Sequence, residues 1–155
     1  MIQRIQSFYL LMTTILSGLF LSGSIFKFSN EEGSELMMNF RGIYEIAADK
    51  NYALAEQIVP VFLVAILVPL ISLLAIFLFK KRKLQLKVTL ILIIAEALLI
   101  AYTAYYVISS LQHSPGTMIP GFRLFIPLIT IILSLMAYRG IRNDENLVKS
   151  YDRLR

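Results

Sequence analysis

The sequence predicts an all-α membrane protein, a four-transmembrane-helix bundle with a small β-hairpin in an outer loop and a cytoplasmic C-terminal amphipathic helix. Three observations lead to this fold class. Of the 155 residues, 57% are hydrophobic and only 16% are charged, whereas about a quarter of a soluble domain is charged. The apolar residues gather in four long runs. Four consecutive cations, Lys80 to Lys83, separate the second run from the third.

Each apolar run is a candidate for crossing about 30 Å of hydrocarbon, at about 1.5 Å per helical residue. A cleaved signal peptide is the alternative for the first run, because Arg4 precedes it and Ser22-Gly23-Ser24 resembles a cleavage site. Pro69, near the middle of the second run, predicts a kink. We place the spans at residues 5–26, 58–79, 88–110 and 122–138 of one domain covering 1–155.

The outer loop, residues 27–57, carries three cations and six acids. Phe26 and Phe28 alternate with Lys27, and after a turn signal at 30–34 the apolar residues Leu36, Met38 and Phe40 recur at every second position, so we expect a β-hairpin. Residues 43–46 would add a third short strand. We expect residues 51–58 to form a helical lead-in to the second span.

The tail, residues 139–155, predicts a short amphipathic helix of its own. Asn143 is the candidate N-cap, and Asp144 and Glu145 would occupy the first turn, where the helix dipole favours acids. The apolar residues from Leu147 to Leu154 fall on one face, so the helix would lie on the membrane surface or dock on a partner.

The distribution of cations predicts the orientation. Eleven lie near the termini and in the 80–87 block, against four in the two loops on the other side, so the positive-inside rule places both termini in the cytoplasm. The block is first a topology signal, and binding of lipid headgroups follows from its position. A protein or nucleic-acid partner for so short a loop is the weaker reading, and we expect no nucleic acid. Its cations are Lys80, Lys81, Arg82, Lys83 and Lys87.

Glu96 is the only acid within an expected span. It lies eight residues after Val88, about 12 Å into the membrane. Three readings stay open for it: a proton or ion relay, a neutral carboxyl that hydrogen-bonds neighbouring helices, or a contact with another subunit. Counted to the same depth, the other spans offer hydroxyl partners at Thr13, Thr14, Ser72 and Thr130.

Small residues suggest two close-packing faces. Gly18 and Ser22 form one pair, and Ala97, Ala101 and Ala104 form a stripe beside Glu96.

Motifs for chemistry are missing from the sequence. There is no cysteine and a single histidine, His113, and the acids Glu31, Glu32 and Glu35 fit a solvated turn better than a cation site. No phosphate-binding loop, nucleophile elbow or zinc-helix motif occurs. We therefore expect neither an enzyme nor a cofactor or metal site.

Both ends of the chain resemble a known family. The opening Met1-Ile2-Gln3-Arg4-Ile5-Gln6 and the closing segment from Asp144 to Arg155 are similar to a family of small four-span membrane proteins from Bacteroidota, a domain of unknown function that covers essentially the whole chain. The resemblance implies a bacterial inner-membrane protein and carries no activity. Since both ends are expected in the cytoplasm, they could dock on each other, for example Arg4 on Asp152, with Arg153 and Arg155 nearby.

Two functions remain in view. A non-catalytic accessory or scaffold subunit of a membrane complex fits the small size and the tail, and would have a protein partner or form a homo-oligomer. A small transporter or lipid-binding protein would use Glu96.

Overall fold

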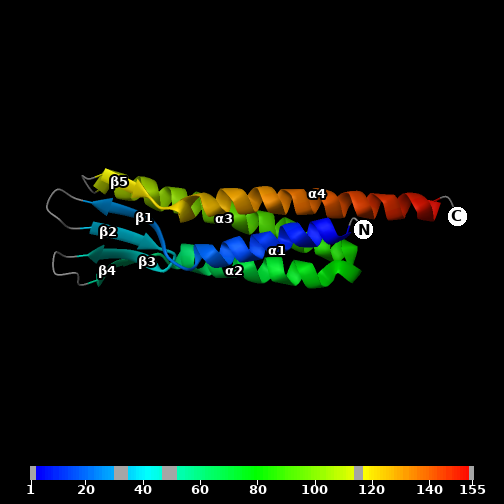
Figure 1. Ribbon diagram of the computed structural model, residues 1–155, viewed down its shortest axis with the longest axis horizontal. Coiled ribbons are helices and arrows are strands. Elements are labelled where there is room, and N and C mark those ends of the chain that lie inside the picture. Colours follow the sequence, from blue (N-terminus) through cyan, green and yellow to red (C-terminus); the bar gives the residue numbers. More distant parts are fainter. Residues whose placement is uncertain (1–2, 30–34, 47–51, 114–116, 154–155) are drawn as a thin grey trace.

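The computed structural model of the chain describes residues 3–29, 35–46, 52–113 and 117–153. Its helices lie side by side, and a β-sheet continues from one end of the helical part (Figure 1). The start of α1 (Gln3–Phe20) and the end of α4 (Ile126–Arg153) lie at the opposite end. We call the end that carries the sheet the sheet end, and the end that carries the start of α1 and the end of α4 the terminal end.

Four long helices form the helical part, and each packs against two others. α1 contacts α2 and α4, while α3 contacts α2 and α4. The second and third helices in the chain are α2 (Val59–Phe77) and α3 (Arg82–His113), and single 3₁₀ turns, η1 (Leu78–Lys80) and η2 (Phe122–Phe125), precede α3 and α4.

Three helical segments among the described residues are long and apolar enough to cross a membrane. They are Val59–Lys80, Arg82–Gln112 and Phe122–Leu147. The apolar segment of α1, Ile5–Phe20, is shorter. Length and composition therefore agree with a membrane protein and single out three of the four helices.

α1 ends earlier than the sequence predicts. The helix stops at Phe20 and strand β1 begins at Ser24, although we expected a span over 5–26. Serine and glycine at 22–24 are weak helix formers, and the alternating residues that follow are suited to a sheet.

Arg123 closes the end of α1. Its guanidinium Nε donates to the carbonyl oxygen of Leu19 at 3.2 Å, and a terminal nitrogen donates to the Ser22 hydroxyl at 3.3 Å. A cation is favoured at the negative end of a helix dipole. Gly23 provides the room, since a Cβ there would lie 2.7 Å from Arg123 Cζ.

The cationic block is not a loop. η1 ends at Lys80 and α3 begins at Arg82, so Arg82, Lys83 and Lys87 lie in the first turns of a 32-residue helix. Lysine, arginine, leucine and glutamine are all good helix formers, which explains why the helix starts six residues before the expected span.

α4 also differs from the prediction, because no separate tail helix exists. It runs unbroken to Arg153, and Asn143 lies within it and caps nothing. No proline or glycine follows Gly140 to stop the helix.

The sheet is larger than the expected hairpin. Five antiparallel strands follow the order β4-β3-β2-β1-β5. The hairpin and the third strand are confirmed, but residues 52–57 form a strand where we expected a helix, and a strand at 117–120 was not predicted. The strands are β1 (Ser24–Ser29), β2 (Glu35–Asn39), β3 (Gly42–Ile46), β4 (Tyr52–Gln57) and β5 (Thr117–Pro120).

One apolar core joins the helices to the sheet. Phe26, Phe28 and Met38 are buried on one face of the sheet, whereas Lys27 between the two phenylalanines is exposed on the other. The core continues between the helices through Phe20, Leu10 and similar residues. Burying the phenylalanines fixes the register of β1, because a slip by one residue would expose them.

Candidate functional site

Polar side chains are buried inside the helical part, and the hydroxyls that were expected around Glu96 fall into two layers. Among the residues that the structure describes, ten are both buried and polar or charged. Most of their described hydrogen bonds join helices or return to the backbone one turn earlier. They are Gln6, Thr13, Ser17, Ser72, Gln85, Thr89, Glu96, Thr103, Thr130 and Ser134.

Glu96 lies in the upper layer, nearer the sheet. Its side chain is completely buried, and its Oε1 accepts a hydrogen bond of 3.0 Å from the hydroxyl of Ser134 on α4. Thr130 also lies beside the carboxyl. Within the described part of the chain, Oε2 has no hydrogen-bond partner. The carboxyl thus faces α4 of its own chain rather than the surface.

The other hydroxyls expected around Glu96 belong to the lower layer. Thr14 on α1 donates to the hydroxyl of Ser72 on α2 at 3.1 Å, and Ser72 donates to the carbonyl oxygen of Leu10 at 2.8 Å. Thr13 is buried on the same helix and donates to the carbonyl oxygen of Tyr9. The two bonds of Ser72 join α1 to α2.

The separation follows from where α3 begins. Glu96 lies fourteen residues after Arg82, about 21 Å along the helix, instead of about 12 Å from an assumed start at Val88. Ser72 lies only nine residues before Lys81, so the two residues sit at different heights. Ser134 was missed, although it follows Thr130 by one helical turn and so shares its face.

A charged cluster lies at the terminal end. Arg82 on α3 forms a 2.7 Å ion pair with Asp144 on α4, and Nε2 of Gln6 on α1 donates to the same carboxylate oxygen at 2.8 Å. The side chains of Arg82 and Asp144 are only 22% and 11% exposed. Three helices are therefore held at one point by charge-assisted hydrogen bonds.

The opening and closing segments of the chain meet, as the sequence predicts, but the contact is made by residues other than those in the predicted example. Gln6 belongs to the opening motif and Asp144 starts the closing one, so parts of both recognisable segments are in contact. The expected pair, Arg4 with Asp152, lies outside the described side chains, as do Arg153 and Arg155.

The remaining cations of the 80–87 block are exposed. Lys80, Lys81, Lys83 and Lys87 point outward, whereas Arg82 is half-buried in its ion pair. Lys80 Nζ lies 5.9 Å from the ring centre of Phe79. One member of the block is thus structural, and the other four form a basic surface at the turn between α2 and α3.

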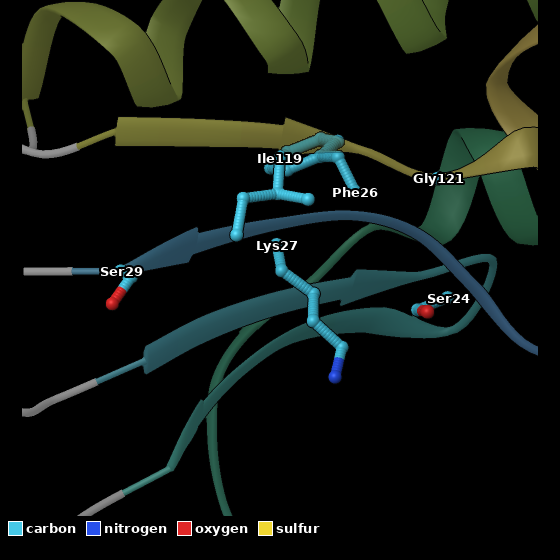
Figure 2. A pocket seen from close by; sticks show the side chains of 6 residues that line it. All are labelled: Ser24, Phe26, Lys27, Ser29, Ile119 and Gly121. Atoms are coloured by element: carbon cyan, nitrogen blue, oxygen red, sulfur yellow. The ribbon is translucent and has the colours of Figure 1, made fainter.

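A second feature is the open groove beside β1 and β5, with a volume of about 420 Å³. Figure 2 shows that Lys27 extends away from Ile119 and Phe26, while Ser24 and Ser29 stand near opposite ends of the strand. Small-molecule sites need polar groups that converge on one point. Here they point apart, so the groove does not have that arrangement.

Metal-ligating residues do not gather anywhere within the described ranges, where no group of three or more acids or histidines occurs. The acids at 31–32 and the side chains of Glu35 and His113 lie outside the described part.

Comparison with known proteins agrees with the resemblance of the two chain ends. A search of curated proteins finds no match. A family model described as "Domain of unknown function (DUF4293)" matches residues 2–154, nearly the whole chain. The protein therefore belongs to this family, a domain of unknown function.

Proposed function

We propose that the protein is an integral protein of the bacterial inner membrane and acts as a non-catalytic accessory or scaffold subunit of a membrane complex. In this arrangement all four helices lie in the bilayer, the sheet lies outside, and both termini are cytoplasmic. Three helices long and apolar enough to span support it, as does the basic surface at the terminal end. The same basic surface suits anionic lipid headgroups.

The observation that carries the scaffold role is the length of α4. This helix continues past the ends of the other helices at the terminal end (Figure 1). Its projecting part begins near Asp144, which is anchored to α1 and α3, so its direction is fixed. Leu147 on this part is 53% exposed. A held, projecting helix with an exposed apolar residue suits a protein partner.

Co-purification from native membranes in a mild detergent tests the scaffold role. We expect a partner at a fixed ratio to the chain. Leu147→Glu should remove it, because the substitution places a charge on the apolar contact. Asn146→Glu, at the neighbouring exposed position, is the matched control and should retain it. A protein that purifies alone in all three forms contradicts the scaffold role.

A second function, transport or lipid binding through Glu96, rests on one specific observation. The carboxyl is completely buried, and its Oε2 has no hydrogen-bond partner among the described residues. Buried ionisable groups in membrane helices often serve ion pathways.

Proton flux into liposomes containing the purified protein, followed with a pH-sensitive dye, separates the two functions. A relay requires flux that Glu96→Gln abolishes. A structural carboxyl predicts no flux in either form and similar thermal stability, because glutamine can still accept the hydrogen bond from Ser134.

A further inference from the structure

The exposed face of α3 carries the stripe of small residues Ala97, Ala101 and Ala104. All three are exposed, so the stripe packs against none of the described helices of its own chain. Small residues let another membrane helix approach closely. A stripe of small residues does not by itself identify the partner that packs on it. Three neighbouring features indicate which partner this is.

The first is a groove of about 240 Å³ along one flank of the stripe. It lies between α3 and the start of α4, and its walls are almost wholly apolar. The α3 wall includes Ile100, Thr103 and Val107, and the opposite wall includes Leu124 and Leu128.

The second is Thr103, whose side chain lines this groove while its hydroxyl oxygen is buried. Thr103 is 3% exposed, and its Oγ1 has no hydrogen-bond partner within the described residues. Thr13 and Thr89 instead donate to the carbonyl oxygen four residues earlier. A hydroxyl without a partner is costly in hydrocarbon. The groove is therefore incomplete in a single chain.

The third is Tyr105, whose side chain is 65% exposed. At 3.6 residues per turn, Tyr105 lies roughly 70° to one side of the stripe, and the groove residues Ile100 and Val107 lie roughly 70° to the other side. A protruding ring and a groove thus flank the stripe at the same height.

We infer that this face of α3 binds a second copy of the chain. Two copies in one membrane are related by a two-fold axis parallel to the helices. Such an axis places the Tyr105 flank of each stripe against the groove flank of the other, as an isologous interface requires. A rotation about χ1 of Thr103 exchanges its methyl and hydroxyl, and the phenol oxygen of the second copy's Tyr105 then accepts its hydrogen bond.

A lipid chain fits this face less well. An acyl chain could fill the groove, but it offers no acceptor to Thr103 and leaves Tyr105 uncovered. The inference rests on the helices lying in a membrane, and it does not depend on the scaffold role.

Disulfide crosslinking in isolated native membranes tests it directly, because the chain has no cysteine of its own. Ala101→Cys should give a crosslinked dimer on mild oxidation. Leu63→Cys is the control, because Leu63 is 55% exposed on α2 and lies at a similar height. It is eighteen residues from Lys81, and Ala101 is twenty residues from Lys81. We expect at least a tenfold difference in the dimer fraction. Equal crosslinking at both positions overturns the proposal. This holds whether both variants crosslink through random collision or neither variant crosslinks.

Two small substitutions test the contact itself in the Ala101→Cys background. Tyr105→Phe and Thr103→Val each remove one oxygen and keep the shape. Each should lower the dimer fraction about threefold, the effect of a typical hydrogen bond between membrane helices. The double variant should lower it no further, because both changes remove the same bond. Unchanged dimer in both single variants contradicts the hydrogen bond between copies.

Recovery of the protein in the detergent-soluble membrane fraction is measured alongside. A chain absent from that fraction contradicts the proposed membrane location. Membrane-bound chains that do not crosslink contradict only the dimer, so the two failures can be told apart.

Discussion

Gln6 and Asp144 are 138 residues apart in the chain, yet Nε2 of the first donates to Oδ2 of the second at 2.8 Å. Arg82 binds the same oxygen at 2.7 Å. One carboxylate thus holds the first, third and fourth helices together at the terminal end.

Removing this carboxylate should destabilise the protein. Asp144→Ala leaves Arg82 without its ion pair and Gln6 without its acceptor, and should lower the free energy of unfolding by about 2 kcal/mol. Thermal unfolding of the purified protein in detergent measures the change. Arg82→Met should cost less than Asp144→Ala, and the double variant less than the sum of both. Strictly additive losses would show that the two side chains do not interact.

Gly140 should be sensitive to substitution and Gly18 insensitive. A Cβ at Gly140 would lie 2.8 Å from Cγ of Gln6, so Gln6 must move away from Asp144. Gly140→Ala should therefore lower the free energy of unfolding by about 1 kcal/mol despite its better helix propensity.

Nothing lies within 4 Å of a Cβ at Gly18, so Gly18→Ala should be neutral or stabilising in the same thermal assay. Equal effects at both positions would mean that the space beside Gln6 is not needed.

The two ends of the helical part should react differently with a membrane-impermeant maleimide. Glu45→Cys is exposed on the sheet and Lys83→Cys is exposed at the terminal end. In intact cells the first should be labelled and the second protected until the membrane is opened, because the positive-inside rule places the basic end in the cytoplasm. The reverse pattern would invert the proposed orientation.

Arg123 should stabilise the end of α1. Arg123→Gln keeps some hydrogen-bonding capacity but loses the charge, and should cost about 1 kcal/mol through the lost interactions with the Leu19 carbonyl and the helix dipole. Gly23→Ala should cost a similar amount, since the new Cβ would displace the guanidinium. Thermal unfolding measures both, and the effects should not add if they act through the same contact.

Periodicity explains which parts of the fold the sequence could predict. The apolar runs and the alternation around Phe26 and Phe28 are local signals, and they predicted the helices and the hairpin. β5 could not be found in this way, because residues 117–120 are short and pair with a strand about ninety residues earlier. The sequence predicts a helical lead-in over residues 51–58 because Asp49 precedes it as a candidate cap, yet pairing with β3 makes residues 52–57 a strand.

The depth of Glu96 could not be predicted for a related reason. The change from charged to apolar residues predicts that the third span starts at Val88, although lysine and arginine extend a helix as readily as apolar residues do. Because α3 begins six residues before the expected start, Glu96 lies beside Ser134 rather than beside Ser72. Hydropathy locates the apolar part of a helix, whereas helix–helix register depends on where the helix really starts.

The strand order has a consequence for the way the chain is made. One edge of β1 pairs with β2, which follows it closely in the chain. The other edge pairs with β5, which is synthesised only after α3. Until then β1 presents an unpaired edge, which is a site for pairing with the wrong chain. Completion of the sheet therefore requires that the third helix has already been synthesised, and a chain stalled before residue 117 would keep an aggregation-prone edge.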